Sequence, residues 1–267
     1  MLSIKSMFLL GGITLLVSCT SGPLTINLTN TLDVSRQNET VEINIYDLPQ
    51  NMVSMIERVG VYDPSEGLFL TTQLIDLDKD GQMDQLIFQP ELAAKSSKIY
   101  HIIEHLENET DVKYCYSRFV PSRIDDYTWE NNRVAFRTYG PAAQDLIENG
   151  QKGGIISSGI DCWLKRVDYP VIDKWYKASE EEGISYHEDH GEGLDNYHVG
   201  ISRGAGGLSI KGADDQYFVS KNFTAYNTIS NGPLRTIFQL DYADWDGPDG
   251  KIKEQKTISL DYGNNLM

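Results

Sequence analysis

The sequence predicts a mainly β protein built from antiparallel strands, with two short helical insertions. Segments of alternating apolar and polar residues, typical of strands with one buried face, recur along most of the 267 residues. Between such segments stand Asn231-Gly232 and Asp246-Gly247, pairs that favour tight hairpin turns. Two stretches, Pro141–Glu148 and Tyr169–Glu182, carry helix signals instead.

Residues 1–19 are expected to form a lipoprotein signal peptide. A short, weakly basic start precedes the apolar stretch Met7–Val17, which is too short to span a bilayer. Small residues then precede Cys19, as in a bacterial lipobox, so Cys19 would be lipidated. An ordinary signal peptide with an incidental cysteine is the alternative. We therefore expect an exported protein in the periplasm or at the outer membrane, touching the membrane only through its lipid anchor.

Residues 20–115 are expected to form an N-terminal β region. Strands are predicted at Val41–Tyr46, Phe69–Ile75 and Gln85–Gln89 from their alternation and from the turn residues beside them. His101–Leu106 fits either a strand or a short helix, and the pattern does not separate the two.

Residues 116–267 are expected to form the second β region and to carry the functional site. In the strand predicted at 134–140, Val134, Phe136 and Thr138 share one face, whereas Arg133, Ala135, Arg137 and Tyr139 share the other. A face with two arginines and a tyrosine is poorly suited to a core. It is either a solvated outer face or a concave face that binds anions.

The remaining strands follow the same reasoning. Gly159–Arg166 alternates, which places Asp161, Trp163 and Lys165 on one side. Further strands are predicted at Gln216–Tyr226, Leu234–Tyr242 and Lys256–Asp261. The sequence stops just after the last of these strands, so whether a C-terminal piece is missing stays open.

The net charge limits the binding partners, and the cysteines have two alternative states. The formal net charge of −16 disfavours nucleic acid and anionic membrane surfaces. With Cys19 lipidated, Cys115 and Cys162 remain in an oxidising compartment, either as a disulfide or as two buried free thiols.

An aspartate-rich segment, the aspartate loop (Asp76–Asp84), resembles a calcium loop. Asp76, Asp78, Asp80, Gly81 and Asp84 match calcium-loop positions 1, 3, 5, 6 and 9. Ile87 stands where an EF-hand needs a bidentate glutamate, and the flanks read as strands. A structural Ca²⁺ between two strands and a metal-free turn rich in Asp and Gly both remain open.

The stretch Tyr186–Gly207 concentrates polar chemistry, since it holds His187, His190 and His198. His187 and His190 are three residues apart in a glycine-bounded segment, whereas a helical zinc motif needs a spacing of four. The glycines at the end of the stretch lack the strand–turn–helix context of a phosphate loop. No Gly-x-Ser-x-Gly supports a serine hydrolase.

Acid–base chemistry without a nucleophile or a required cofactor is therefore the favoured interpretation. Histidine titrates near neutrality, and tyrosine beside cations can move a proton. Arginine or lysine can neutralise a substrate carboxylate and so acidify the proton beside it. These groups suit β-elimination from a uronic acid.

Four runs resemble a family of secreted bacterial lipoproteins, domain-of-unknown-function family 4861. They are DLDKDGQMDQLIF, RFVPSRIDDYTWENNRVAFRTYG, GIDCWLKRVDYPVIDKWY and YHEDHGEGLDNYHVG, and they cover much of residues 70–210. The resemblance implies an antiparallel supersandwich like that of galactose mutarotases and polysaccharide lyases. It also implies a place in polysaccharide breakdown, because an oligosaccharide dehydratase acting on uronic acids is similar to this family.

We therefore expect a dehydratase or lyase that leaves a 4,5-unsaturated uronate on an oligosaccharide. His187 is the expected base, Tyr197 the acid or second base, and Arg137 with Lys165 the carboxylate clamp. Other expected substrate-binding residues are Tyr139, Trp163, Asp195, His190 and Arg133.

Two alternatives belong to other classes. One is a non-catalytic sugar-binding lipoprotein with a stacking platform of Trp129, Tyr139 and Trp163. The other is a glycoside hydrolase that uses two of Glu188, Asp189, Glu192 and Asp195.

Overall fold

The computed structural model describes residues 23–106, 113–200 and 203–265. They divide into two compact units, one made of residues 23–76 and 81–106 and the other of residues 77–80 and 113–265. The predicted signal peptide and Cys19 lie outside the described residues. Within the described part of the chain, no helix is long and apolar enough to cross a membrane.

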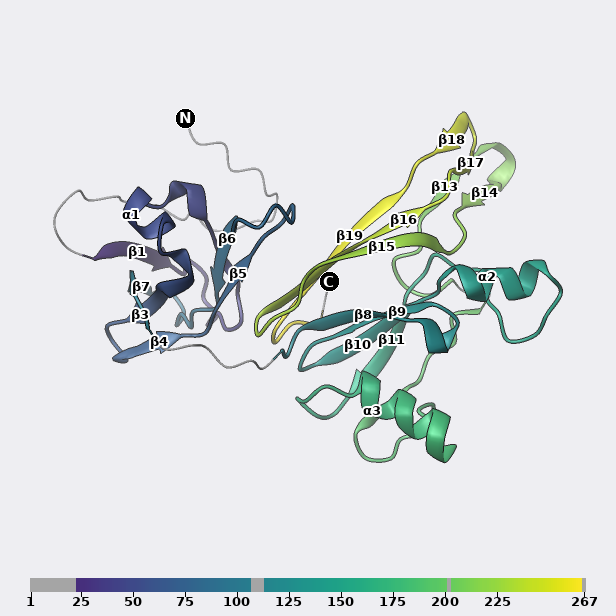
Figure 1. Cartoon of the computed structure of the whole chain (residues 1–267), viewed down its shortest axis with the longest axis horizontal. Coiled ribbons are helices and arrows are strands. Elements are labelled where there is room, and N and C mark those ends of the chain that lie inside the picture. Colours follow the sequence, from purple (N-terminus) through teal and green to yellow (C-terminus); the bar gives the residue numbers. More distant parts are fainter. Residues whose placement is uncertain (1–22, 107–112, 201–202, 266–267) are drawn as a thin grey trace. The chain divides into compact units, whose positions relative to one another are not determined.

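The N-terminal unit is a small sandwich of two antiparallel sheets, ordered β1-β7-β3-β4 and β2-β6-β5 (Figure 1). Its elements are β1 (Leu24–Thr29), β2 (Val41–Asn44), α1 (Gln50–Val53), β3 (Val59–Asp63), β4 (Leu68–Leu70), β5 (Thr72–Ile75), β6 (Gln85–Phe88) and β7 (Ser97–Glu104). The core joins Ile26, Val61 and Tyr100 of the first sheet to Leu86 and Phe88 of the second. Burying one face of each sheet in this way explains the alternation seen in the sequence.

Two N-terminal segments differ from the prediction, and the structure assigns a third that the sequence had left open. The strand predicted at Phe69–Ile75 is two strands, because β4 pairs with β3 while β5 pairs with β6 in the other sheet. Strand β2 stops early because the Asn44 side chain accepts from the backbone N–H of Tyr46 and caps a 3₁₀ turn. Of the segment that fitted either strand or helix, residues 101–104 form the end of β7, and residues 105–106 follow the strand.

The C-terminal unit is built around a five-stranded antiparallel sheet, ordered β12-β11-β10-β9-β8. Its strands are β8 (Tyr116–Val120), β9 (Asp126–Glu130), β10 (Val134–Thr138), β11 (Asp161–Lys165) and β12 (Gly193–Asp195). A second sheet holds β15 (Phe223–Ser230), β16 (Arg235–Tyr242) and β19 (Gln255–Asp261). The mainly antiparallel β fold with helical insertions is thus confirmed.

Each face of the five-stranded sheet packs against a different layer (Figure 1). On one face, Tyr127, Trp129 and Phe136 pack against Phe238 and Leu240 of the second sheet. On the other face, residues such as Ala135 and Trp163 pack against Trp175 and Tyr176 of α3 (Ile172–Lys177). The sheet is therefore a middle layer, and the second face lies under a helix.

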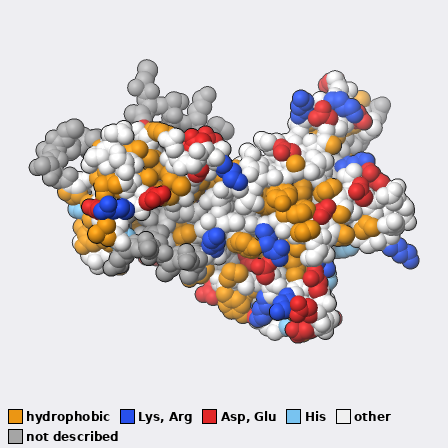
Figure 2. All heavy atoms as spheres, in the orientation of Figure 1, with side chains coloured by type: hydrophobic (Ala, Val, Ile, Leu, Met, Phe, Trp, Pro, Cys, Tyr) orange, Lys and Arg blue, Asp and Glu red, His pale blue; other side chains and the backbone are white. Residues whose placement is uncertain are grey.

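The two predicted helices are present. Helix α2 (Pro141–Glu148) begins at its proline, as expected. Helix α3 continues as a π-helical turn, Ala178–Glu182, and ends at Gly183, whose φ of 70° is left-handed. Figure 2 shows basic and acidic side chains interspersed on the surface of the molecule. Two residues of α3 form ion pairs, Asp173 with Arg118 and Lys174 with Glu192.

One predicted turn is displaced. Asp246-Gly247 lies within strand β17 (Trp245–Gly247), which pairs with β18 (Gly250–Ile252). The turn falls instead on Pro248-Asp249, since Gly247 pairs directly with Gly250. The remaining hairpin joins β13 (Ser209–Lys211) to β14 (Tyr217–Val219). Cys115 and Cys162 are free thiols, so the disulfide alternative does not hold.

Candidate functional site

Arg137 lies at the centre of an ionic cluster on the helix-covered face of the five-stranded sheet. Its Nε donates to Asp161 Oδ2 at 2.9 Å and its Nη2 donates to Asp195 Oδ2 at 3.2 Å. Its Nη1 lies 3.7 Å from Asp126 Oδ2. The Arg137 side chain is only 11% exposed, and the three carboxylates are almost fully buried. The predicted cationic face is therefore neither solvated nor open to anions at Arg137, because the chain's own carboxylates occupy it.

Strand pairing explains this assembly. Arg137 on β10 stands directly opposite Asp161 on β11, and Trp163 on β11 stands opposite Asp195 on β12. Residues opposite one another or two apart along a strand share a face. The carboxylate of Asp126 enters from the start of β9.

Aromatic side chains enclose the cluster. The Tyr186 hydroxyl oxygen accepts from Arg137 Nη1 at 3.1 Å and from Arg123 Nη2. The Tyr186 ring stacks on Trp163 with centroids 5.2 Å apart. The Tyr176 hydroxyl, from α3, donates to Asp126 Oδ2 at 3.3 Å. The helix thus shields the ionic groups from water.

Burial changes how readily the carboxyl groups ionise. Burial, followed by the neighbouring Asp161 carboxylate, raises the pKa of Asp195 to about 7 although Arg137 opposes the shift. Burial likewise raises the pKa of Asp126 to about 6, against the two arginines nearby. The cluster can therefore hold or release a proton near neutral pH, as groups at functional sites often do.

His187 is where this cluster reaches solvent. Its Nδ1 lies 3.3 Å from both the carboxylate Oδ2 and the backbone O of Asp195. A backbone carbonyl oxygen can only accept, so we assign the hydrogen to Nδ1 and the lone pair to Nε2. The side chain is 54% exposed, which makes the imidazole available to a ligand. An imidazole oriented by a carboxylate in this way is suited to act as a general base.

Tyr139 and Tyr197 also lie at this end of the sheet. The Tyr139 hydroxyl donates to Asp161 Oδ2 at 3.4 Å, although the residue is buried. Tyr197 is 55% exposed, and its backbone N–H hydrogen-bonds to Asp195. Together with His187, Arg137 and Asp195, these residues are the part of the predicted site that the fold brings together.

Lys165, in contrast, lies at the other end of β11. Its Nζ is fully buried and donates to Glu130 Oε2 at 2.7 Å and to the backbone O of Asn131 at 2.6 Å. Lys165 follows Asp161 by four residues, about 13 Å along a strand. The prediction that Lys165 and Arg137 clamp one substrate carboxylate is therefore wrong, since both cations are buried in separate ion pairs.

The stacking platform predicted for a sugar ring is not formed. Trp163 has no exposed surface, because Trp175 and Tyr186 stack against it. Trp129 is equally buried, but in the core on the opposite face of the sheet. Two tryptophans in separate cores cannot form one platform for a sugar ring, so this prediction is corrected.

Two further predicted residues lie apart from the cluster. Arg133 is exposed and precedes the start of β10, at the end of the strand where Lys165 lies. His190 is exposed, and its Nε2 lies 3.1 Å from the backbone O of Ser185. Neither has a hydrogen bond or ion pair to the Arg137 cluster among the described residues.

Sequence patterns did not identify Arg123 and Asp126 as site residues. They flank a strained turn, in which Ile124 and Asp125 have left-handed φ values of 53° and 64°. A β-branched residue in that region is an outlier, and such strain is concentrated at functional sites. The strain is not visible in the sequence, because neither residue is a glycine.

The start of α2 holds this turn in place. A Cβ on Gly140 would lie 2.0 Å from the backbone O of Asp125, so only glycine permits the contact. The backbone N–H of Ala142 also donates to Asp125 Oδ2 at 3.2 Å. The turn is thereby fixed where it delivers Arg123 and Asp126 to the cluster.

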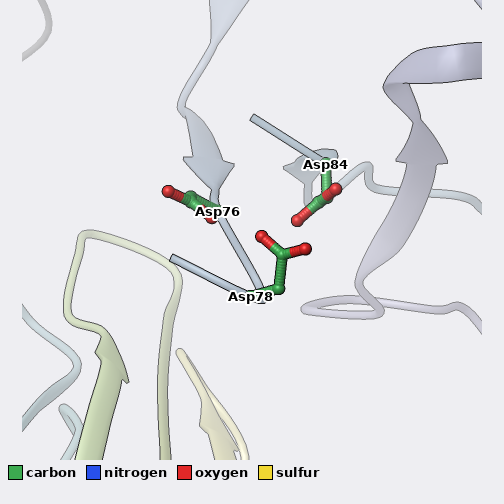
Figure 3. A group of neighbouring side chains, drawn as sticks. All are labelled: Asp76, Asp78 and Asp84. Atoms are coloured by element: carbon green, nitrogen blue, oxygen red, sulfur yellow. The ribbon is translucent and has the colours of Figure 1, made fainter. Parts of the chain in front are cut away.

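The aspartate loop is a second group of carboxylates, between β5 and β6. One oxygen each from Asp76, Asp78 and Asp84 lies within 4.8 Å of the others, and the three side chains point toward one another (Figure 3). Asp80, which the spacing had included, is not part of this group. Carboxylate oxygens are ligands that Ca²⁺ prefers, so these three are the residues that could hold it. A structural Ca²⁺ stays a prediction.

The sequence matches the family described as "Domain of unknown function (DUF4861)" over residues 28–267. "Uncharacterized protein P7" of Formosa agariphila is 51% identical over 244 residues, and the match covers 90% of this chain but 61% of that protein. The chain thus spans less than two thirds of the length of this relative. A solved structure, an alpha-mannosidase from Enterococcus faecalis, aligns with 90% of this chain and 28% of its own at 11% identity and a TM-score of 0.29. Because the family match spans most of the sequence, the chain belongs to the DUF4861 family.

Proposed function

We propose that this protein acts on uronic-acid-containing oligosaccharides by elimination of the dehydratase or lyase type. The observation that carries the proposal is the contact between His187 and Asp195, at the point where a buried ionic cluster meets solvent. An exposed imidazole supported by a buried carboxylate is an arrangement for removing a proton from a bound ligand.

The reaction proceeds in steps that conserve atoms and charge. Nε2 of His187 takes the proton from the carbon beside the substrate carboxylate. The electron pair left behind forms the double bond to the next carbon, and the bond from that carbon to its oxygen breaks. The departing oxygen takes a proton and leaves as water in a dehydratase or as an alcohol in a lyase. The remaining sugar is a 4,5-unsaturated uronate.

The cluster supports the proton transfer electrostatically. When His187 becomes charged, the Asp195 carboxylate at 3.3 Å stabilises the new imidazolium. Arg137 holds that carboxylate in place through its own hydrogen bond. Tyr197 is the proposed proton donor, because it is exposed and only two residues from Asp195.

A glycoside hydrolase is less well supported by the carboxyl groups of this segment. Glu192 is held by Lys174, Tyr169 and Trp175, and these hydrogen bonds lower its pKa to about 2. Asp189 pairs with Arg166 and accepts from backbone N–H groups. A hydrolase needs one carboxyl group that keeps its proton and reaches the sugar. Asp195 has a raised pKa, but it is buried and does not reach a sugar.

A panel of defined oligosaccharides ending in uronic acids tests the proposal. Turnover is followed by the ultraviolet absorbance of the new conjugated double bond, with a full-length relative as the positive control. We expect His187→Ala to lose turnover while retaining affinity for the oligosaccharide. His101→Ala, on strand β7 of the N-terminal unit, is the matched control and should behave like the wild type. An unaltered chain that yields no absorbance gain across the panel would refute the elimination.

A further inference from the structure

The two arginines beside Tyr186 differ in their availability to a ligand. Arg137 has three carboxylates within 4 Å and is almost buried. Arg123 is partly exposed and, among the described residues, forms no ion pair with a carboxylate. Its Nη2 donates to the Tyr186 hydroxyl, while its Nε–H is buried without a hydrogen-bond partner.

Arg123 is also held rigidly. Its guanidinium carbon lies 5.0 Å from the centre of the Tyr176 ring and 5.4 Å from that of Tyr186. Cation–π contacts of this kind restrain a guanidinium without neutralising its charge. The strained Ile124–Asp125 turn follows directly in the chain, and contact with Gly140 keeps that turn in place. A positioned cation without an ion-pair partner within 4 Å among the described residues is an arrangement typical of anion recognition.

We propose that Arg123 binds the carboxylate of the substrate. This inference rests on the proposed function, because it presumes an acidic sugar. Guanidinium and carboxylate match as a planar, bidentate pair, and Arg123 is partly exposed. As His187 removes the neighbouring proton, negative charge accumulates on the substrate carboxylate. A fixed cation at that point stabilises the transition state more than the ground state.

The surroundings of Tyr186 connect this binding position to the base. The Tyr186 hydroxyl contacts Arg123 and its ring lies 4.5 Å, centroid to centroid, from the His187 ring. Because Tyr186 is buried, a sugar whose carboxylate meets Arg123 would lie beside this residue, toward His187. Arg123 takes the role that was predicted for Arg137 and Lys165. The consequence is selectivity for acidic over neutral sugars.

The test compares a uronate-ended oligosaccharide with its carboxyl-reduced, neutral counterpart. Binding to each is measured by titration calorimetry for the wild type, Arg123→Gln and Arg123→Lys. We expect Arg123→Gln to weaken binding of the uronate by roughly 10- to 100-fold, as for loss of a hydrogen bond to a charged group. Binding of the neutral sugar should not change. Arg123→Lys keeps the positive charge but not the planar arrangement of N–H donors. This variant should therefore retain part of the preference for the uronate and show a raised KM, with kcat less affected.

Arg118→Gln is the matched control. Arg118 lies on the neighbouring strand β8, and its Nε donates to Asp173 at 2.8 Å, outside the cluster. This variant should keep the wild-type preference for the uronate. Thermal unfolding of all variants shows whether they fold. If Arg123→Gln does not fold, Arg123→Lys is used to test the inference.

The outcomes separate the inference from the proposed function. Equal weakening for both sugars, or an unchanged preference in Arg123→Gln, overturns the assignment of Arg123. A wild-type protein that binds no uronate in the panel overturns it as well. If the wild type binds uronates through Arg123 but forms no double bond, the inference stands and the elimination falls.

Discussion

Replacing Lys165 by methionine tests whether this buried cation supports the fold or the substrate. The Lys165 and Glu130 side chains are 0% and 1% exposed, and their charged atoms are 2.7 Å apart. Glu130 also accepts from the backbone N–H groups of Val171 and Ile172, where α3 begins. Removing the ammonium leaves a buried carboxylate without its cation, which typically costs about 3–5 kcal/mol. We expect the lower end, about 3 kcal/mol, because the two N–H donors remain.

Urea unfolding followed by tryptophan fluorescence measures this loss. Lys174→Met is the matched control, because Lys174 pairs with Glu192 on the surface and should change the free energy of unfolding very little. Adding Glu130→Gln to Lys165→Met should recover part of the loss, since it removes the unpaired charge but keeps an acceptor for α3. A loss below about 1 kcal/mol would contradict the reasoning. Weaker uronate binding at unchanged stability would also contradict the reasoning, because Lys165 would then act in the substrate site.

Three further predictions follow from the cluster, the strained turn and the aspartate loop. Burial and Asp161 raise the pKa of Asp195 from 3.8 to about 7, so the folded state retains a proton that the unfolded state has lost between these pH values. Wild-type stability relative to Asp195→Asn should therefore fall as pH rises through that window, by up to about 1.4 kcal/mol per pH unit. Urea unfolding from pH 4 to 8 measures it, and a constant difference would contradict it. Gly140→Ala places a Cβ 2.0 Å from a backbone oxygen, so we expect a loss of about 1–3 kcal/mol in thermal unfolding and weaker uronate binding. An unchanged melting temperature would show that the turn moves freely. If the aspartate loop binds Ca²⁺, a concentration 100-fold above Kd should stabilise the fold by about 2.7 kcal/mol, and Asp78→Asn should abolish the effect. The absence of any calcium-dependent change in melting temperature would exclude the site.

Local patterns in the sequence determined the type of most elements. The alternation at 134–140 and 159–166 became strands β10 and β11, and Pro141 and Gly183 mark the helix boundaries as expected. Such predictions succeed because the period of a strand or helix and the φ preferences of proline and glycine act over a few residues. The same patterns made His187 a candidate, since a polar segment interrupted by glycines cannot form a core.

Only the tertiary structure decided which of the predicted groups meet. The sequence placed Arg137 and Lys165 among cationic candidates, but antiparallel pairing sets Arg137 opposite Asp161 and carries Lys165 to the other end of β11. Trp163 became a buried residue because α3 covers its face of the sheet. Arg123 reaches Tyr186 across 63 positions of the chain. Register and layer order arise from contacts between distant residues, so no local pattern could have assigned the three carboxylates to Arg137 and left Arg123 without an ion pair among the described residues.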